Sequence, residues 1–210
     1  MDGMLSQEEI NALLGNMNTG SSSTQTSNDA ILSDEEKDAI GEISNICMGT
    51  AATTLSVLVN NRVEITTPKL SYVTLDDLKE QNPAPCVFIY ISYRTGLEGK
   101  NILVLKEHDV KVITDLMMGG DGTNTDGELG ELHLSAISEA MNQMMGSSAT
   151  SLSSMLNCKI DISPPEAELV DMAGNIDVAK ASDFLDKDFV RVTFRMTIGD
   201  LVDSTIMQLY

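Results

Sequence analysis

Two pairs of polar residues, each a glutamate followed three positions later by an asparagine, are the candidates for chemistry in this sequence. They are Glu42 with Asn45 and Glu139 with Asn142. Hydrolysis of a phosphoryl group requires mainly an in-line water and charge stabilisation, and a side-chain amide can hold that water as the glutamine of small GTPases does. The glutamate could pair with a cation on a partner that supplies the metal ion and the phosphorylated carboxylate. These four residues are therefore candidate catalytic residues.

The two pairs belong to an internal repeat. A shift of 97 residues aligns Glu42 with Glu139 and Asn45 with Asn142 without a gap. Repeated aliphatic residues at helical spacing are typical of a core, whereas repeated polar residues are not. Each half is therefore expected to be one structural unit, and the two units to pack about a pseudo-twofold axis. Further identities are Ala39/Ala136, Ile40/Ile137, Met48/Met145, Gly49/Gly146, Ala52/Ala149, Thr53/Thr150, Leu55/Leu152, Asn60/Asn157, Ile65/Ile162 and Pro68/Pro165.

A long helix is predicted to position the first pair. Ser33 and Glu36 form a capping box at its start, and the pattern continues to about Leu58. At about 100° per residue, Glu42 and Asn45 share one face of this helix. The opposite face is apolar, so both side chains are expected to point to solvent. The predicted buried residues are Ile40, Ile43, Cys47, Ala51 and Leu58.

A second long helix is predicted from Glu131. Its exposed face holds Ser135, Glu139, Asn142 and Gly146, and its buried face Ile137, Ala140, Met144 and Met155. Glycine inside a helix costs about 1 kcal/mol relative to alanine. Gly49 and Gly146 therefore indicate that another molecule approaches the exposed faces closely.

Strands are predicted between the two helices, followed by a glycine-rich loop. Strands are expected at Val63–Thr67, Leu70–Thr74, Cys86–Tyr93 and Asn101–Leu105, a helix at Val110–Met118 and a loop at Gly119–Gly130. An EF-hand requires glycine at its sixth position and glutamate at its twelfth. Counted from Asp121, these positions hold Asp126 and Leu132. The loop is therefore predicted to be an acidic connector between the repeats and not a metal site.

The N-terminus has the pattern of a short helix on a tether. Ser6 and Glu9 form a capping box, but isolated helices shorter than about 12 residues are rarely stable, so this helix should fold on another surface. The stretch from Asn16 to Ala30 has almost no apolar residue and is expected to be flexible. The predicted parts are a peptide (1–15), a linker (16–32) and a globular domain (33–210) with repeat halves of about 33–122 and 131–210.

The charge and cysteine content exclude several classes of site and partner. With 32 acidic and 13 basic residues the formal charge is −19, which disfavours nucleic acid and anionic membranes. No apolar run approaches the roughly 20 residues that span a bilayer, so a cytoplasmic protein is expected. Cys47, Cys86 and Cys158 form no CxxC motif and are predicted to be free thiols, with neither disulfides nor zinc.

The spacing of both repeats resembles D/S-x3-E-x2-N-x22-P, the active-site signature of the CheC, CheX and FliY family of CheY phosphatases. The first copy is Asp38, Glu42, Asn45 and Pro68, and the second is Ser135, Glu139, Asn142 and Pro165. The resemblance covers residues 33–210. It implies that each asparagine positions the attacking water and each glutamate binds a lysine of CheY. It also implies no metal or cofactor of the chain's own, with Mg²⁺ supplied in the CheY active site.

The N-terminal segment resembles the CheY-binding peptide of FliM and FliY proteins. The residues expected to bind CheY are Leu5, Ser6, Glu9, Ile10, Leu13 and Leu14. Similarity to the FliY group implies a place at the cytoplasmic face of the flagellar basal body, with FliM and FliG as partners of the full-length protein. FliY proteins continue into a C-terminal FliN-like domain. The present sequence stops in a strand-like run at residues 206–210, so docking on the motor switch is not carried over.

The family implies an α/β fold, a pseudo-twofold CheC-like sandwich with a central, mostly antiparallel sheet and two long exposed signature helices. Two alternatives stay open. The FliM middle domain resembles the same fold without the catalytic pattern, so the chain could be a non-catalytic switch scaffold that binds phosphorylated CheY. One repeat could also have lost activity. Two intact copies of the Glu–Asn pair favour a phosphatase with two working sites.

Overall fold

The computed structural model describes residues 32–171 and 189–210. The predicted peptide and nearly all of the predicted linker, residues 1–31, lie outside the described residues. The chain divides into a first unit, Met1–Ser33, and a second, compact unit, Asp34–Tyr210. The second unit contains both Glu–Asn pairs.

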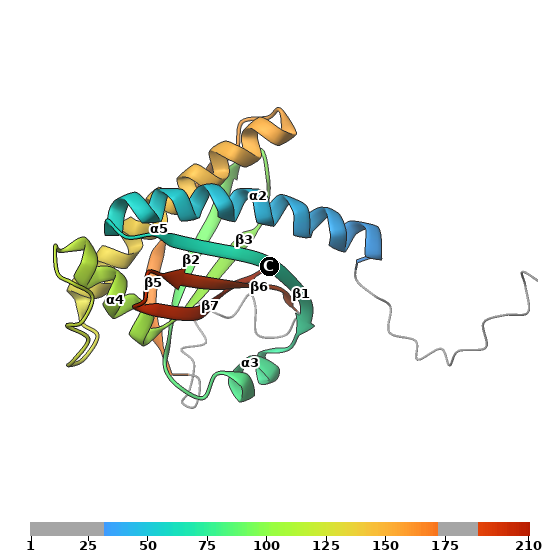
Figure 1. Ribbon diagram of the computed structural model, residues 1–210. Helices are drawn as coiled ribbons and strands as arrows, with labels where there is room; N and C mark the ends of the chain where they lie inside the picture. Colours follow the sequence, from blue (N-terminus) through green and yellow to red (C-terminus); the bar gives the residue numbers. More distant parts are fainter. Residues whose placement is uncertain (1–31, 172–188) are drawn as a thin grey trace, which may run out of the picture. The chain divides into compact units, whose positions relative to one another are not determined.

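The second unit is a mixed α/β structure in which the two predicted long helices are confirmed (Figure 1). Both helices have 26 residues. The predicted strands Val63–Thr67 and Leu70–Thr74 are one continuous strand. In chain order the elements are α2 (Asp34–Val59), β1 (Val63–Val73), α3 (Leu75–Gln81), β2 (Cys86–Thr95), β3 (Lys100–Lys106), α4 (Glu107–Met117), α5 (Glu131–Leu156), β4 (Asp161–Ile162), β5 (Glu166–Val170), β6 (Phe189–Ile198) and β7 (Val202–Leu209).

The strands form one sheet in which every described pair is antiparallel. Its order is β1-β6-β7-β3-β2-β4, and β5 also pairs with β2. The strands of the two repeats therefore interleave. Each strand of the first repeat corresponds to one of the second: β1 to β4 and β5, β2 to β6, and β3 to β7. Exchanging the corresponding strands gives the same order read from the opposite edge of the sheet. This relation confirms the predicted pseudo-twofold arrangement, and the axis passes between β3 and β7, where Leu103 pairs with Gln208.

The ends of α2 and α5 are built in the same way. The Ser56 hydroxyl accepts a hydrogen bond from the Val63 backbone N–H at 2.9 Å, and the Ser153 hydroxyl accepts the equivalent bond from Ile160 at 2.9 Å. Ser56 and Ser153 are themselves related by the 97-residue shift. The repeated asparagines Asn60 and Asn157 follow the two helices with positive φ angles of 48° and 50°. Asparagine tolerates this left-handed conformation better than most residues, which explains its repetition.

Helices α2 and α5 lie on one side of the sheet and cross there (Figure 1). The Thr54 hydroxyl donates to that of Ser147 at 2.9 Å, and the Ser151 hydroxyl donates to that of Thr50 at 2.9 Å. The 97-residue shift converts the first contact into the second. Because Thr50 meets Ser151 while the later Thr54 meets the earlier Ser147, the helices run past each other in opposite directions.

The sheet separates two apolar clusters because successive side chains of a strand point to opposite faces. In β3, Leu103 and Leu105 belong to the cluster beneath α2 and α5, whereas Ile102 and Val104 belong to the cluster that contains Leu78 of α3. The larger cluster combines residues of both repeats, so neither repeat has a separate core.

Helix α3 was not predicted. Its start is a capping box in which the Asp77 N–H donates to the Thr74 hydroxyl at 3.2 Å and the Thr74 N–H donates to the Asp77 carboxylate at 2.8 Å. The Asp77 carboxylate accepts hydrogen bonds from the Thr74 backbone N–H and from the Thr74 hydroxyl, and these two bonds lower the pKa of Asp77. With only seven residues, the helix is too short to show a helical period clearly.

One prediction about burial was wrong. Met155 was placed on the buried face of α5 but is 39% exposed, because this end of the helix projects beyond the sheet (Figure 1).

Helix α2 has a length and composition that could span a membrane, with a mean hydropathy of 1.2 over 18 residues. A third of that window, 33%, is buried within the protein, where α2 packs against β1 and α5. Packing against β1 and α5 thus accounts for part of the apolar content of α2.

Candidate functional site

The candidate catalytic side chains lie on the exposed faces of the two crossing helices. Glu42, Asn45, Glu139 and Asn142 are all exposed, as the helical pattern predicted. The opposite face of each helix is buried against the sheet, including Cys47 and Met48 of α2 and Ile137, Ala140 and Met144 of α5. Burial of the apolar stripe therefore sets the direction in which both Glu–Asn pairs point.

The two pairs form separate sites. The paired hydroxyl contacts at the centre of the crossing lie at least five residues beyond each asparagine, as Thr50 follows Asn45 and Ser147 follows Asn142. One further contact, from the Ser148 hydroxyl to the Cys47 carbonyl at 3.0 Å, lies nearer to Asn45. A helix rises about 1.5 Å per residue, so each amide lies roughly 10 Å along its helix from the crossing. Because the helices run in opposite directions, the pairs lie on opposite sides of the crossing. One partner molecule could approach each pair independently.

The amides are available to a partner. Within residues 32–171 and 189–210, the side chains of Asn45, Asn142 and Glu42 make no hydrogen bond. Glu139 differs, because one of its carboxylate oxygens accepts a hydrogen bond from the Gln143 amide at 2.8 Å. Gln143 is not among the predicted site residues, although a glutamine four residues after a glutamate is a recognisable helical pairing.

The repeated glycines leave open space beside the pairs. A Cβ atom added to Gly49 or Gly146 would meet no neighbouring atom within 4 Å. Internal packing therefore does not require glycine at either position. Both residues lie one turn beyond an asparagine on the exposed face, where the missing side chain lets an approaching surface come nearer to the helix backbone.

The remaining signature residues have different positions. Asp38 and Ser135 are exposed, one turn before Glu42 and Glu139. Pro68 lies in the edge strand β1, where the pairing with β6 shifts register between Thr66 and Lys69.

Pro165 lies between β4 and β5, where the equivalent edge strand is interrupted. Proline lacks the N–H that a strand ladder requires, so it occurs at edges and irregularities. The repeated 22-residue spacing thus connects each asparagine to a break in an edge strand.

Among the cavities described here within residues 32–171 and 189–210, none is lined by Glu42, Asn45, Glu139 or Asn142. The space beneath the crossing, lined by Cys47, Met48, Tyr93 and Gln208 among others, has a volume of about 50 Å³. A larger cavity of about 450 Å³ lies between the start of β2 and the start of α4, lined by residues outside both signatures. Drug-sized ligands usually occupy pockets of about 300–1,000 Å³. The exposed helix faces are suited to a macromolecular partner.

The described residues contain no group of three or more His, Cys, Asp and Glu side chains that could hold a metal ion. Cys47 and Cys86 are buried free thiols and Cys158 is an exposed one. Burial raises the pKa of Cys47 and Cys86 above the usual value. These thiols are therefore poor nucleophiles.

Comparison with known proteins agrees with the repeated signature. The family model of the CheC-like family matches residues 35–72 and 132–169, which contain one Glu–Asn pair each. The flagellar motor switch phosphatase FliY of Bacillus subtilis is 47% identical over 208 residues, which cover 98% of the present chain and 54% of the relative. The chain thus spans about half the length of that relative.

Solved structures show the same fold. The crystal structure of Thermotoga maritima FliY matches with a TM-score of 0.78 and 45% identity, covering 85% of the present chain and 91% of the other. The FliM middle domain of H. pylori matches with a TM-score of 0.65 at 14% identity, covering 85% and 93% of the two chains, and shows the fold alone. From the repeated signature, the pseudo-twofold fold and the FliY relatives, the chain belongs to the CheC-like family and, within it, to the FliY group.

Proposed function

We propose that the chain is a phosphatase that hydrolyses the aspartyl-phosphate of CheY, the chemotaxis response regulator, at the flagellar switch. The observation that carries this proposal is the presence of two complete Glu–Asn pairs, each exposed on a long helix and related by pseudo-twofold symmetry. The fold alone would not require the same exposed polar residues at equivalent positions of both repeats. The names of the B. subtilis relatives, a motor switch phosphatase and the CheY-P phosphatase CheC, support the reaction class.

In the proposed reaction, Asn45 or Asn142 orients a water molecule in line with the phosphorus of CheY. The water oxygen forms the new bond to phosphorus, the bond to the aspartyl oxygen breaks, and the aspartate leaves as a carboxylate. Glu42 or Glu139 binds a lysine of CheY and so docks the helix. CheY would supply the Mg²⁺ that neutralises charge on the phosphoryl oxygens. The exposed helix faces favour this division of roles, because neither pair lies in a pocket that could enclose a small substrate.

The proposal includes the N-terminal segment and the flagellar location. Leu5, Ser6, Glu9, Ile10, Leu13 and Leu14 would bind CheY, and they lie outside the described residues. A flexible linker of about 15 residues spans roughly 20–25 Å on average, so a captured CheY would stay near the helices. In the longer protein, FliM and FliG would be partners at the cytoplasmic face of the basal body.

The direct test is phosphate release from phosphorylated CheY in the presence of Mg²⁺. The rate of phosphate release with the Asn45→Ala, Asn142→Ala double variant is expected to fall by about 100-fold, because the attacking water is no longer held in line with the phosphorus. A matched control is Val57→Ala with Ser154→Ala, two exposed, repeat-related positions at the other ends of the same helices. The control should retain full activity.

Single variants test whether both sites work. Asn45→Ala and Asn142→Ala should each keep about half of the activity at saturating substrate, since each leaves one pair intact. If Asn142→Ala changed nothing while Asn45→Ala abolished activity, the α5 site would be inactive. If the folded wild-type chain gave no acceleration at all, a scaffold that binds phosphorylated CheY would replace the phosphatase.

A further inference from the structure

The residue that follows each signature asparagine differs between the two sites. In α2 it is Ile46, which is 43% exposed, and in α5 it is Gln143. The Gln143 amide donates a hydrogen bond to a carboxylate oxygen of Glu139 at 2.8 Å. Isoleucine has no donor, so Glu42 has no equivalent contact on α2. The repeat therefore preserves the glutamate but not the group that holds it.

The contact orders the glutamate before a partner arrives. A free glutamate side chain loses rotamer freedom when it is fixed by a docking lysine. At the α5 site part of that ordering is already present in the unbound protein. An ionised carboxylate can accept about four hydrogen bonds, so the single bond from Gln143 leaves room for an ammonium group.

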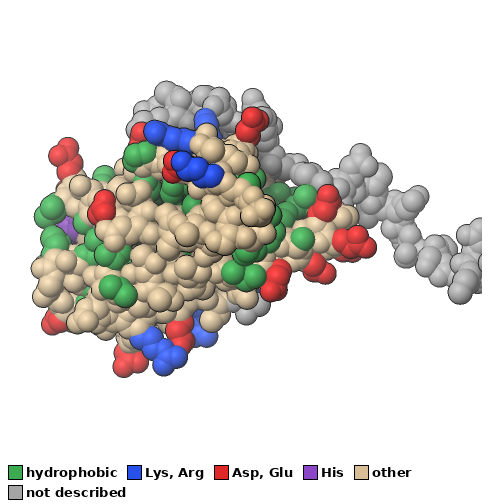
Figure 2. Space-filling model, turned by 90° about the horizontal axis from the view of Figure 1, so that it is seen from above, with side chains coloured by type: hydrophobic (Ala, Val, Ile, Leu, Met, Phe, Trp, Pro, Cys, Tyr) green, Lys and Arg blue, Asp and Glu red, His purple; other side chains and the backbone are tan. Residues whose placement is uncertain are grey.

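The charge around the two sites differs as well. Residues 34–45 of α2 contain five carboxylates and one lysine, whereas residues 131–142 of α5 contain two carboxylates and neither lysine nor arginine. Figure 2 shows acidic side chains gathered toward the end of the molecule where α2 begins. One of the α2 carboxylates, Asp34, is paired with Lys37 at 3.0 Å. The α2 helix thus carries more negative charge beside its own Glu–Asn pair, whereas the carboxylates that precede α5, Asp121, Asp126 and Glu128, belong to the connector.

We propose that the two sites capture the same partner by different means, with Gln143 as a positioning residue for Glu139. The α5 site depends on a carboxylate held in place by Gln143, and the α2 site depends on the negative charge of its helix. This inference rests on the proposed function, because it assigns both glutamates to docking of a cationic group on CheY.

The contribution of Gln143 can be measured in proteins with one working pair. In the Asn45→Ala protein, where only the α5 site remains, Gln143→Met keeps the side-chain length but removes the donor. Its KM for phosphorylated CheY is expected to rise about twofold with kcat unchanged, as loss of one helical side-chain pair implies. In the Asn142→Ala protein, Ile46→Gln should lower KM by about the same factor.

The contribution of charge can be measured in the same two proteins. Exposed charges are screened by salt, with a Debye length of about 10 Å at 0.1 M and about 3 Å at 1 M. The KM of the Asn142→Ala protein, which uses α2, should therefore rise more steeply with salt than that of the Asn45→Ala protein. Equal salt slopes, or a KM unaffected by Gln143→Met, would overturn the inference.

A binding measurement separates this inference from the proposed function. The Kd of CheY activated with beryllofluoride and Mg²⁺ should follow the same pattern as KM. If no variant accelerated phosphate release but Gln143→Met still raised the Kd, the phosphatase would be wrong and the docking role of Gln143 would stand. If phosphate release were normal and neither Kd nor KM responded to Gln143→Met, the phosphatase would stand and the positioning role would fall.

Discussion

At the scale of single residues, two buried aspartates of the same helix differ in their surroundings. Asp115 accepts a hydrogen bond from the Gly122 N–H at 2.8 Å. Asp109 is only 3% exposed, and one of its carboxylate oxygens has no hydrogen-bond partner in the part of the chain that the structure describes. Burial raises the pKa of Asp109 above the usual 3.8, and Ser204, Lys106 and His108 only partly oppose this effect.

Replacement of Asp109 by asparagine is therefore expected to stabilise the protein. An acid whose pKa is higher in the folded state opposes folding wherever the unfolded chain would be ionised. This loss of stability is absent below the pKa of Asp109 in the unfolded chain. It grows as the pH rises above that value and is complete above the pKa of Asp109 in the folded protein. Urea unfolding should show Asp109→Asn more stable than wild type by about 1 kcal/mol at about pH 7, with the difference vanishing toward about pH 3.

Asp115→Asn is the matched control. Its amide oxygen would accept the Gly122 hydrogen bond more weakly than a carboxylate does, so the free energy of unfolding should fall. If Asp109→Asn destabilised the protein as Asp115→Asn does, the Asp109 carboxylate would be stabilising the fold, contrary to the argument from its burial.

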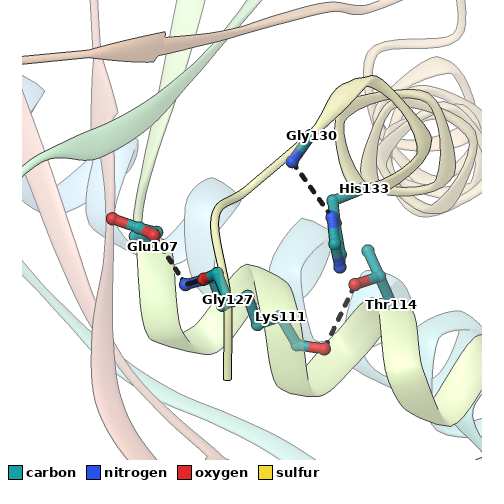
Figure 3. A network of polar contacts seen from close by, with 6 residues as sticks. All are labelled: Glu107, Lys111, Thr114, Gly127, Gly130 and His133. Carbon is teal, nitrogen blue, oxygen red and sulfur yellow. Dashed lines mark hydrogen bonds and ion pairs between the residues drawn. The ribbon is translucent and has the colours of Figure 1, made fainter. Parts of the chain in front are cut away.

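At the scale of elements, α4 anchors the connector that leads into α5 (Figure 3). The Lys111 ammonium, on a side chain only 11% exposed, pairs with Glu107 at 2.7 Å and donates to the Gly127 carbonyl at 2.7 Å. At the end of the connector, the Gly130 N–H donates to Nδ1 of His133 at 3.2 Å. The predicted acidic connector is thus tied to both helices, and α5 begins from a fixed position.

Lys111→Met should loosen this connection. The substitution keeps most of the apolar stem but leaves Glu107 and the Gly127 carbonyl without their partner. A loss of about 2 kcal/mol is expected in urea unfolding, because hydrogen bonds to a charged group contribute roughly 1.5–3 kcal/mol. Amide hydrogen exchange should increase over residues 119–130. Lys79→Met, which removes an exposed pair with Asp76, should change stability by less than about 0.5 kcal/mol. Equal effects of the two substitutions would contradict the anchoring role of Lys111.

At the scale of the whole molecule, the two repeats share one sheet and one core. Strand β1 of the first half pairs with β6 of the second, and β3 pairs with β7. The main apolar cluster contains Leu55 and Leu103 from one half and Phe194 from the other. A half on its own would leave strand edges and apolar surface exposed.

The isolated halves are therefore expected not to fold. Residues 33–122 expressed alone should show no cooperative thermal transition by circular dichroism, because β1 has no strand partner within that fragment. Co-expression with residues 123–210 should restore a cooperative transition, since the break falls in the connector, just before the exposed Thr123. A cooperative transition of residues 33–122 alone would show that the interleaved sheet is not required for folding.

The sequence alone determined the features that depend on local spacing. Helical periodicity over 26 residues predicted both long helices. Because Glu42 and Glu139 lie on the helix faces opposite the apolar residues, the same periodicity predicted that both are exposed. The ungapped repeat predicted the twofold relation because equal sequences adopt equal local structures. The pair residues and the positions of both prolines could thus be identified from one chain.

Tertiary structure alone decided how the repeats combine. Strand pairing is a contact between residues far apart in sequence, such as Leu103 with Gln208, and periodicity carries no information about which strands become neighbours. For the same reason the exposure of Met155 could not be predicted, because it depends on where the sheet ends beneath α5. The spacing of four residues permits a contact between Glu139 and Gln143, but only the structure shows that the Gln143 side chain adopts the rotamer that makes it.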